Sequence, residues 1–403
     1  MGIDRVNGKR GLGDGAVIQE LESDEDFVDY VRKHVGVKDD VTAETENLSG
    51  NINRVRRVRF QSIAGNSPSY VVKHVPKGGQ LERYPTIIFP DSRLSFEARW
   101  LHFCSGSGQS NIVKAPKIIH FGNGNRTLIM EDLKPCITLG EYCQTGNELK
   151  VVLAELGRFL LDIHRASIGA AIVPSNPTAA LNRPYAFSKP IAEPEAMCEL
   201  WRAKQKDRVT DDRLSSIGIS FSEQIELQEG YLRKYARQVL PVLQGLESSF
   251  KQCSDLVLTH GDLHTDSILI LENNSIAVID AELCDYGPAG FDLGTLWAHI
   301  WAGLVSIDSD REKIFETLAW LVSGYAPYSS IRQQSDCAWL LYFLENTAQH
   351  CGAEILRRLL GAAGFNARLT ISQRQYLLEV ATRLLLEPRD YCQKWASILV
   401  SYR

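Results

Sequence analysis

The spacing of apolar residues changes near residue 134, and this change limits the fold more than any other feature of the sequence. Before it, residues 54–60 and 69–75 alternate apolar and polar side chains, as strands do, and a turn-rich stretch separates them. Residues 117–121 and 127–130 flank a second turn, which contains Gly and Asn. After residue 134, most patterns repeat with the helical period of about 3.6 residues. We therefore predict an α+β chain that begins with a small antiparallel sheet and continues with a large helical part.

The same pattern divides the chain into three segments. Residues 1–23 are polar and rich in glycine, so we expect a flexible tail. Residues 24–133 start with a helical pattern and continue with the strands, and we expect a small lobe there. Residues 134–403 are expected to form a large helical lobe. Within that lobe, residues 174–220 show no clear period, and we expect an irregular stretch with one short helix near 195–206. Separate helical patterns run through residues 337–350 and 352–363.

One part of the helical lobe has a different pattern. The apolar runs at 256–258, 268–271 and 276–279 are too short for helices and are predicted to be strands. Polar residues able to do chemistry follow them: Asp262 comes after the first run, and Asp280 and Glu282 come after the last. We expect the strands to hold these carboxylates on rigid supports around one cleft. Mg²⁺ prefers such oxygen ligands together with phosphate oxygens, and phosphoryl transfer needs a further carboxylate to orient the attacking hydroxyl.

The motifs around these carboxylates allow a comparison with a known family. His-Gly-Asp-Leu-His at 260–264, followed by Ile-Asp-Ala-Glu at 279–282, resembles the aminoglycoside phosphotransferase and choline kinase superfamily. Together with Tyr-Gly-Pro-Ala-Gly-Phe-Asp at 286–292 and Glu-Ile-Leu-Arg-Arg at 354–358, the pattern looks most like 5-methylthioribose kinases. The resemblance covers roughly residues 25 to 390. It implies a bilobal protein-kinase-like fold that uses ATP and Mg²⁺, with ATP bound by the small lobe and the acceptor bound by the large one.

The resemblance also implies a role for particular residues. Asp262 matches the catalytic base that positions the acceptor hydroxyl, and Asp280 and Glu282 match metal-binding acids. Lys73 matches the lysine that contacts the nucleotide phosphates, and Glu97 is its expected ion-pair partner. The remaining nucleotide contacts match a phosphate loop and an adenine hinge: Ser49, Gly50, Asn51, Asn53, Met130, Glu131 and Leu133. The substrate residues are Asp262 with Arg357, Arg358 and His264.

Some positions depart from the family pattern. Ser267 stands where most of the superfamily has a metal-binding Asn, but methylthioribose kinases also have Ser there, so Ser267 is expected to contact the metal. Asp266 replaces a small Gly, Ala281 replaces Pro, and Ser49 replaces an acidic residue. These changes leave the acceptor open: 5-methylthioribose is favoured, and a hydroxytryptamine-like phenol, an amino alcohol or an aminoglycoside is the alternative.

Composition and spacing argue against other classes of protein. The 44 Lys and Arg residues against 49 Asp and Glu residues give a formal charge of −5, so we expect no nucleic-acid partner. No stretch approaches the roughly 20 apolar residues of a membrane span. The nine cysteines form no C-x-x-C pair, which is typical of a cytoplasmic protein. The expected partner is a small-molecule hydroxyl acceptor, and a homodimer is compatible with the sequence.

Two alternative functions share parts of the pattern. A metallophosphoesterase would use Gly-Asp-Leu-His at 261–264 and Asp-Ile-His at 162–164, but the second motif lies inside a helical run. A nucleotide-binding pseudokinase would be expected to lack catalytic carboxylates, and all of them are present here. A small-molecule kinase is therefore the favoured function.

Overall fold

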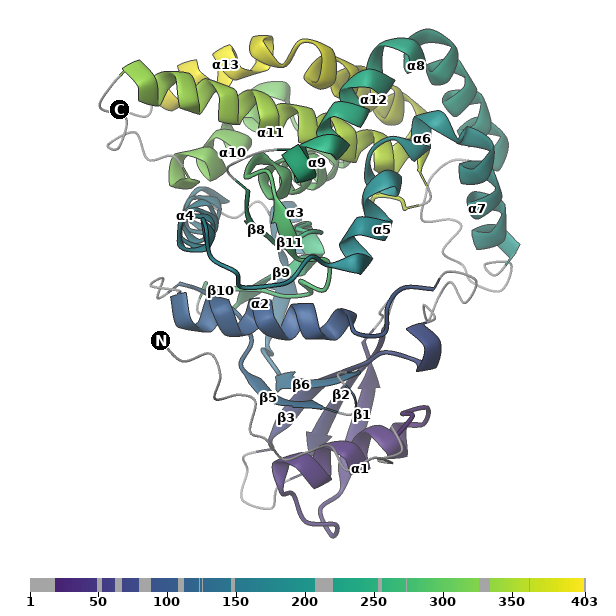
Figure 1. Cartoon of the computed structure of the whole chain (residues 1–403), viewed down its shortest axis with the longest axis vertical. Helices are drawn as coiled ribbons and strands as arrows, with labels where there is room; N and C mark the ends of the chain where they lie inside the picture. Colours follow the sequence, from purple (N-terminus) through teal and green to yellow (C-terminus); the bar gives the residue numbers. More distant parts are fainter. Residues whose placement is uncertain are drawn as a thin grey trace. The chain divides into compact units, whose positions relative to one another are not determined.

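The chain forms two compact units, Met1–Leu94 with Ile119–Glu131 and Ser95–Ile118 with Asp132–Arg403. The computed structural model describes residues 19–48, 53–61, 67–79, 88–107, 112–122, 124, 126–145, 149–206, 220–252, 256–272, 274–325, 334–361 and 363–401. The predicted α+β organisation is confirmed, since the first unit holds an antiparallel sheet and the second is mainly helical (Figure 1).

The first unit is built on a five-stranded sheet in the order β1-β2-β3-β6-β5. Its strands are β1 (Ala43–Asn47), β2 (Arg54–Phe60), β3 (Ser69–His74), β5 (Ile118–Gly122) and β6 (Thr127–Glu131). β2 and β3 pair antiparallel with Arg54 opposite His74, and β3 pairs antiparallel with β6. The two predicted hairpins, β2 with β3 and β5 with β6, are therefore pairs of neighbouring strands in one sheet. A short 3-10 turn (Lys77–Gly79) follows β3.

Helix α1 (Asp24–Val35) packs on this sheet. Ser23 and Asp26 form a capping box at its first turn, and Gly36 ends it in the left-handed conformation with φ 75°. Phe27 and Val31 are fully buried against sheet residues. The first unit thus has its own hydrophobic core, completed by Val58, Phe60, Val72 and Ile129.

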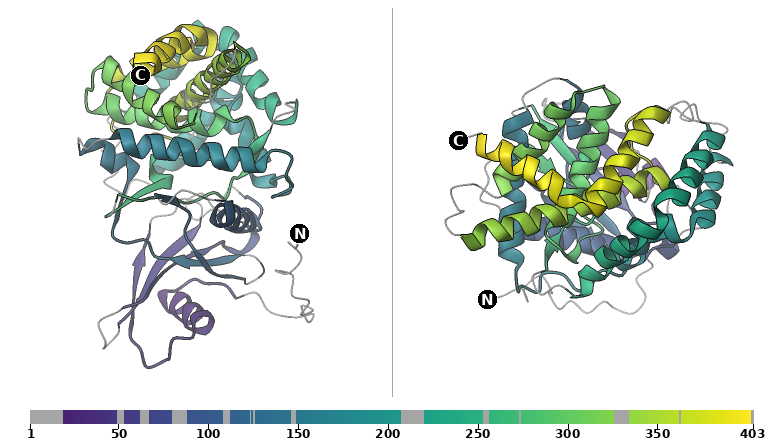
Figure 2. Two further views of the ribbon diagram at one scale, coloured as in Figure 1. Left: turned by 90° about the vertical axis from the view of Figure 1, so that its left-hand side faces the viewer. Right: turned by 90° about the horizontal axis from the view of Figure 1, so that it is seen from above.

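The second unit is dominated by helices. They are α2 (Arg93–Ser107), α3 (Leu139–Gln144), α4 (Leu149–Ser167), α5 (Pro177–Ala186), α6 (Lys189–Ala192), α7 (Pro194–Lys206), α8 (Phe221–Gln252), α9 (Gly290–Ser306), α10 (Arg311–Tyr325), α11 (Gln334–Leu360), α12 (Ile371–Leu386) and α13 (Pro388–Ser401). α9 is buried along most of its length and packs against α11, which in turn packs against α12 and α13. Figure 2 shows α11, α12 and α13 in yellow-green to yellow.

Two small sheets interrupt the helices of the second unit. The first has the order β4-β10-β9-β7, with β4 (Val113–Lys114), β7 (Cys136–Thr138), β9 (Ile268–Leu271) and β10 (Ile276–Val278). The second pairs β8 (Val257–Thr259) antiparallel with β11 (Asp285–Gly287). The three short strands predicted at 256–279 therefore exist. A 3-10 turn (Thr265–Ser267) leads into β9.

Two expectations for the helical part need correction. The stretch predicted to be irregular contains α5 and α6 as well as the expected α7, because Asn176 caps α5 and Pro177 occupies its first helical position. The helical patterns on either side of Gly352 form one continuous helix, α11. Gly352 lies where α11 crosses α12, since an added Cβ would lie 2.8 Å from the carbonyl oxygen of Ala381.

In the part of the chain that the structure describes, no helix is long and apolar enough to cross a lipid bilayer.

Candidate active site

The loop after β8 is fixed by Asp292, a buried residue of the first turn of α9. Its carboxylate accepts hydrogen bonds from the backbone N–H of His260 at 2.6 Å and of Gly261 at 3.2 Å. Gly261 has φ 91°, and an added Cβ would lie 2.0 Å from the carbonyl oxygen of Leu283. Only glycine fits there without a backbone shift, so the loop conformation is built into the sequence.

The imidazole of His260 links this loop to the segment that follows β10 and contains Asp280. Its Nε2 lies 2.8 Å from the carbonyl oxygen of Ile279, the residue before Asp280. The ring is buried, with the edge of Trp100 near it at a centroid distance of 5.2 Å. Burial lowers the pKa of His260, so it is a neutral donor that holds the loop and the end of β10 together.

The carboxylate of Asp262 lies beside two arginines of α11. Arg357 Nη1 is 3.3 Å from Asp262 Oδ1, and Arg358 Nη2 is 3.2 Å from the same oxygen. The buried carboxylate of Glu354 bonds both arginines from the other side, at 3.0 Å to Arg357 Nη1 and 2.5 Å to Arg358 Nε. Two cations and two anions balance, which reduces the cost of burying them together.

This cluster sets the ionisation of Asp262. Burial opposes the charged form, but the guanidinium groups of Arg357 and Arg358 outweigh it and hold the pKa of the Asp262 carboxyl well below its usual range. The same two arginines lower the pKa of Glu354 against the effect of its burial. Asp262 is therefore an ionised hydrogen-bond acceptor near neutral pH, suited to orienting a hydroxyl and too weak a base to remove its proton before attack.

Two stacked histidines extend the cluster. His264 Nδ1 accepts the N–H of Asp266 at 3.2 Å, and its Nε2 lies 3.9 Å from Asp262 Oδ2. The His264 ring stacks on His299 with a centroid distance of 5.2 Å. His299 Nε2 lies 3.2 Å from Glu354 Oε1. Burial lowers the pKa of His299 to about 3, so this ring is neutral and donates to Glu354.

Residues 364–366 contact this cluster from the loop between α11 and α12. The carbonyl oxygen of Gly364 lies 3.4 Å from Arg358 Nη1, and the edge of Phe365 meets the His299 ring at a centroid distance of 5.1 Å. The side-chain amide of Asn366 donates to Asp266 in the loop that follows β8. One short segment therefore contacts the arginine, the histidine and the loop.

The sequence also matches known proteins over most of its length. The profile of the phosphotransferase enzyme family matches residues 44–320, which is more than half of the chain. The chain belongs to this phosphotransferase family. The methylthioribose kinase of Pectobacterium atrosepticum is 24% identical over 365 residues, covering 84% of this chain and 85% of that kinase. A methylthioribose kinase of Bacillus cereus is 32% identical over 124 residues, covering 26% of this chain and 30% of its own length.

Solved structures of more distant proteins also align with this phosphotransferase. A choline kinase from Cryptosporidium parvum covers 94% of this chain and 99% of its own, with 15% identity and a TM-score of 0.47. A spectinomycin phosphotransferase in complex with ADP and spectinomycin covers 91% and 100%, with 16% identity and a TM-score of 0.46. Family membership rests on the sequence match. The match makes the protein a kinase that acts on a hydroxyl group, as the motifs predict.

The predicted metal residues of this phosphotransferase lie on the segment that follows β10. Asp280 has φ 72°, a left-handed conformation that is uncommon for residues other than glycine and often marks a functional position. The Glu282 side chain is buried. Among the described residues there is no group of three or more His, Cys, Asp or Glu that could hold a metal alone. Mg²⁺ in kinases takes only one or two carboxylates plus phosphate oxygens, so an oxygen-only pair of acids fits that ion.

Ser267, the third predicted metal residue, lies between the two carboxylate segments. Its hydroxyl donates to the carbonyl oxygen of Asp262 at 3.1 Å, and its own carbonyl accepts the N–H of Ile279 at 2.9 Å. Ser267 thus ties the loop that follows β8 to the end of β10. Metal contact by Ser267 stays a prediction.

The predicted nucleotide residues are divided between the two units. Asn53, Lys73, Met130 and Glu131 belong to the first unit and Glu97 and Leu133 to the second, whereas Ser49, Gly50 and Asn51 lie outside the described residues. Lys73 is a buried residue of β3, opposite Val55 and Leu128. Asn53 Oδ1 accepts the Nε–H of Arg93 at 2.9 Å. Glu97 is a fully buried residue of α2. Their roles in binding a nucleotide stay predictions.

The structure adds residues that the sequence analysis did not assign to the site. Glu354 was noted only as the first letter of a motif, and His299 and Asn176 were not singled out. The sequence did carry a signal for Glu354: this acid stands three residues before one arginine and four before the other, a spacing that allows ion pairs along a helix. No local pattern signals His299, because its partner Glu354 is 55 positions away.

The Asp162-Ile-His164 motif of the phosphoesterase alternative lies in α4, as its helical pattern predicted. Asp162 is exposed, and His164 Nδ1 is bonded to the hydroxyl of Tyr325 at 2.8 Å. His164 therefore packs inside the helical unit, where it braces α4 against α10.

Proposed function

We propose that this phosphotransferase is an ATP-dependent small-molecule kinase that phosphorylates a hydroxyl of a sugar-like metabolite, with 5-methylthioribose favoured. The observation that carries the proposal is the ionised carboxylate of Asp262 next to the paired arginines of α11. The alignment with the Pectobacterium atrosepticum methylthioribose kinase, which covers most of both chains, supports the choice of acceptor.

Asp262 acts by orientation in this proposal. Its carboxylate accepts the hydrogen bond of the acceptor hydroxyl and aims the oxygen at the γ-phosphorus for in-line attack. Because its pKa is lowered, the hydroxyl keeps its proton until bond formation is advanced. Positioning alone is able to supply a large part of the rate enhancement.

Arg357, Arg358 and His264 are the proposed acceptor contacts. The two guanidinium groups bear N–H donors in a fixed planar fork, which suits the several oxygen acceptors of a sugar. Glu354 and Asp262 hold both groups in place. An aromatic amine would gain little from such a donor-rich surface, which favours the sugar over the hydroxytryptamine alternative.

The proposed cofactors are ATP and Mg²⁺. Asp280 and Glu282, with Ser267 beside them, would hold the ion, which neutralises phosphate charge when bound. Asn53, Lys73, Glu97, Met130, Glu131 and Leu133 are the described residues proposed to serve the nucleotide. Lys73 is proposed for the phosphates because it is a buried residue of β3 and matches the phosphate-contacting lysine of the kinases that the sequence resembles.

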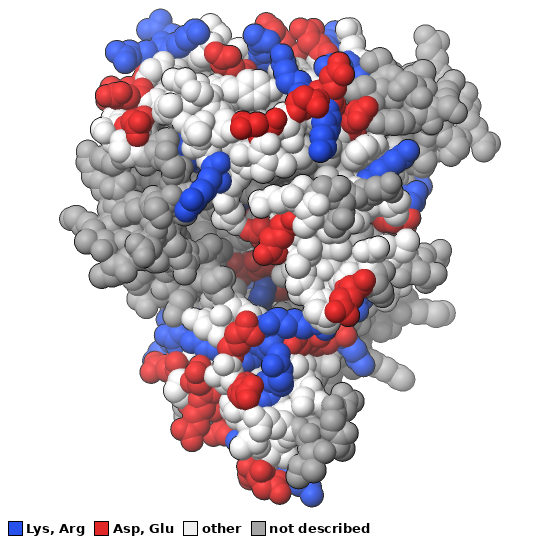
Figure 3. Space-filling model, turned by 180° about the vertical axis from the view of Figure 1, so that it is seen from behind, with Lys and Arg blue, Asp and Glu red and all other residues white. Residues whose placement is uncertain are grey.

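The remaining partner predictions are unchanged. On the face in Figure 3, basic and acidic side chains are interspersed over the helices at the top, in keeping with the small net charge. Such a surface offers no reason to propose a nucleic-acid partner. A homodimer and a cytoplasmic location stay predictions.

The proposal is tested by Mg²⁺-dependent ADP release with a panel of acceptors: 5-methylthioribose, ribose, choline, an aminoglycoside and 5-hydroxytryptamine. 5-Methylthioribose is expected to raise ADP release well above the water background and to give a phosphate ester at its anomeric hydroxyl by ³¹P NMR. If another acceptor turns over and 5-methylthioribose does not, the acceptor assignment is wrong. If none does, the kinase proposal loses its support.

The role of Asp262 is tested by Asp262→Asn. The amide keeps the shape but donates as well as accepts, so kcat is expected to fall at least about a hundredfold while the Kd for ATP changes little. The matched control is Asp162→Asn, which removes an exposed carboxylate of α4 and should leave kcat unchanged. Retained turnover in Asp262→Asn would remove this residue from the reaction. A loss in Asp162→Asn would instead favour the phosphoesterase motif.

A further inference from the structure

We infer that residues 170–183 act as a brace that positions the proposed metal-binding segment, and that Asn176 is its central positioning residue. The brace rests on the proposed function, since it acts on the segment that contains Glu282. It also assigns a role to the start of the stretch that shows no regular pattern in the sequence.

Asn176 uses its whole side chain to join two elements. Its Nδ2 donates to the carbonyl oxygens of Glu282 and Cys284, both at 2.9 Å. Its Oδ1 accepts the backbone N–H groups of Thr178 at 2.9 Å and Ala179 at 3.3 Å, which caps α5. An Asn amide has two donors and two acceptor positions, and all four are satisfied in this fully buried residue.

The two carbonyls belong to the turn that contains Glu282. This turn is closed by the N–H of Cys284 bonding the carbonyl of Ala281 at 3.1 Å. The side chains of Glu282 and Cys284 are buried as well. Buried carbonyls without a donor are costly, so loss of the Asn176 amide would favour a different peptide orientation at Glu282. The direction of the Glu282 carboxylate depends on that backbone.

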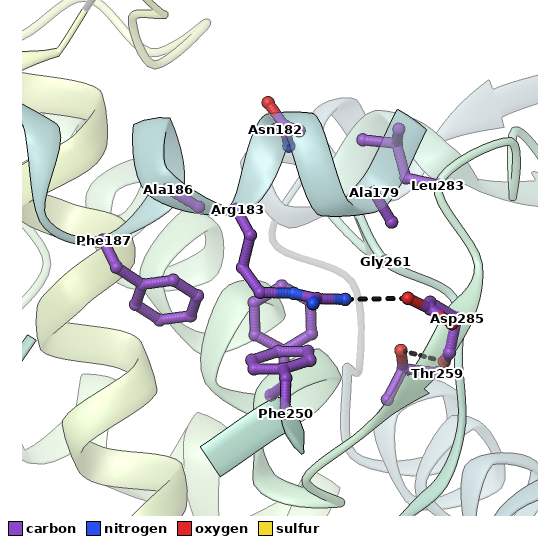
Figure 4. Close-up of a pocket in the computed structure, with 11 residues that line it drawn as sticks. Ala179, Asn182, Arg183, Ala186, Phe187, Phe250, Thr259, Gly261, Leu283 and Asp285 are labelled. Carbon is purple, nitrogen blue, oxygen red and sulfur yellow. Dashed lines mark hydrogen bonds and ion pairs between the residues drawn. The ribbon is translucent and has the colours of Figure 1, made fainter. Parts of the chain in front are cut away.

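Further contacts hold the residues that follow the turn. Arg183 Nη2 of α5 lies 2.7 Å from Asp285 Oδ2, with both side chains largely buried. The Arg183 guanidinium also lies over the Phe250 ring at 4.3 Å from its centroid. Figure 4 shows the Arg183 side chain extending from α5 to the carboxylate of Asp285, the first residue of β11. The hydroxyl of Thr259 donates to the carbonyl oxygen of the same Asp285. α5 is therefore bound to β11 as well as to the turn.

A tyrosine makes the last contact of the brace. The hydroxyl of Tyr286 accepts the N–H of Ile172 at 3.1 Å and donates to the carbonyl of Ala170. The segment 282–286 is thus held at Glu282, Cys284, Asp285 and Tyr286 by residues that lie more than a hundred positions earlier. If α5 only covered the hydrophobic core, apolar contacts would be enough. The hydrogen bonds and the ion pair to residues 282–286 would not be needed.

The test measures metal binding directly on the full chain. Free Mn²⁺ is titrated by its EPR signal in the presence of ADP, using wild type, Asn176→Ala and Asn176→Asp. Aspartate still caps α5 but cannot donate to the two carbonyls. Both variants are expected to weaken Mn²⁺ binding at least fivefold and to raise the Mg²⁺ concentration needed for half-maximal activity by a similar factor.

The matched control is Thr370→Ala. Thr370 caps α12 by accepting the N–H of Gln373 at 3.3 Å, so the variant loses a comparable helix cap. The hydrogen bonds of Thr370 are to Gln373 and Arg374, all within the first turn of α12 and away from residues 282–286. Thr370→Ala is expected to lower the unfolding midpoint yet to bind Mn²⁺ like wild type. Equal weakening in this control would mean that general loss of stability explains the effect, and the brace would be wrong.

A milder variant covers the case in which Asn176→Ala does not fold. Tyr286→Phe removes one hydroxyl and keeps the ring, and it is expected to weaken Mn²⁺ binding about twofold and to speed amide exchange in residues 281–286. Wild-type Mn²⁺ binding in both Asn176→Asp and Tyr286→Phe would overturn the brace alone. If the wild-type protein does not bind Mn²⁺ in the presence of ADP, both the proposed metal site and the brace are wrong.

Discussion

At the scale of single residues, the candidate site depends on a balance of four charges. Asp262 and Glu354 oppose Arg357 and Arg358, and each carboxylate lies within hydrogen-bond distance of both arginines. Glu354 is not among the proposed acceptor contacts, yet its carboxylate bonds both arginines that are. We therefore regard it as a positioning residue that keeps the guanidinium groups from collapsing fully onto Asp262.

Replacing Glu354 by Gln tests this role. The variant leaves two arginines against one carboxylate, so they should bind Asp262 more tightly and be less available to the acceptor. The expected result is a fall in kcat/KM for the acceptor of at least about tenfold, or about 1.4 kcal/mol of transition-state stabilisation, with little change in KM for ATP.

The control lies on the same helix. Glu345→Gln removes the carboxylate that bonds Arg389 at 2.8 Å, where the arginine side chain is 80% exposed. Exposed ion pairs contribute little, so neither kcat/KM nor stability should change measurably. Steady-state kinetics of both variants decide the question: matched kinetics in the two would leave Glu354 without a positioning role.

The residue roles differ in how far the sequence could predict them. Asp262, Arg357 and Arg358 come from separate motifs, and the structure does bring them together. His299 could not be assigned from one sequence, because a buried pairing between two helices leaves no local periodicity. Glu354 offered only its spacing of three and four residues from the two arginines. The role of Asn176 could not be predicted either. Its amide bonds backbone carbonyl groups about a hundred positions away, and a backbone partner leaves no signal in the sequence.

At the scale of elements, strands and long helices were predictable and their packing was not. The period-2 runs became β2 and β3 because alternation matches a half-buried sheet. The separate patterns at 337–350 and 352–363 belong to one helix, α11. Gly352 is tolerated inside it because contact with α12 favours a residue without a side chain more strongly than helix propensity opposes it. Capping by Asn176 likewise created α5 in a stretch without apolar periodicity.

Helices α4 and α10 also cross at glycines, and among the described residues their backbones approach more closely than those of α11 and α12. An added Cβ at Gly324 of α10 would lie 1.8 Å from the carbonyl oxygen of Ala154, and one at Gly157 of α4 would lie 2.2 Å from the carbonyl oxygen of Leu321. The two glycines therefore let the helix backbones touch. Because the obstacle is backbone on both sides, rotation of a side chain cannot relieve it.

We expect Gly324→Ala to destabilise the protein by at least about 2 kcal/mol, since the helices must separate and lose packing. Gly245→Ala is the matched change, because Gly245 lies in α8 with nothing within 4 Å of an added Cβ. That variant should be stabilised by about 0.5–1 kcal/mol through helix propensity. Urea unfolding of both, followed by tryptophan fluorescence, compares them. A stabilised Gly324→Ala would show that α4 and α10 do not pack this closely.

At the scale of the whole molecule, buried neutral histidines make stability depend on pH. Burial lowers the pKa of His74 in the first unit to about 4, although Glu20 raises it. Burial also lowers the pKa of His299 and of His350 in the second unit to about 3. Each binds its proton less readily in the folded chain than in the unfolded one. Their stabilising contribution is therefore complete above about pH 6.5 and is lost as the pH falls toward 3.

His350 offers the cleanest test of this dependence. Among the described residues, neither ring nitrogen has a hydrogen-bond partner, and the ring lies among Phe187, Phe250 and Phe291. The nearby charge is Asp292, which raises the pKa of His350 but does not offset burial. The ring thus contributes an apolar surface together with a group that becomes charged when the chain unfolds in acid.

His350→Leu removes the titrating group and keeps an apolar side chain, so the variant should lose less stability than wild type between pH 7.5 and pH 5. With an unfolded pKa near 6.5, the difference amounts to about 2 kcal/mol at pH 5. All seven tryptophans belong to the second unit, so their fluorescence during urea unfolding follows the unit that contains His350. The comparison between the two pH values within each protein cancels the packing change caused by leucine itself. Parallel losses of stability in variant and wild type would mean that His350 is not held neutral by the fold, and His299 would then be the next residue to replace.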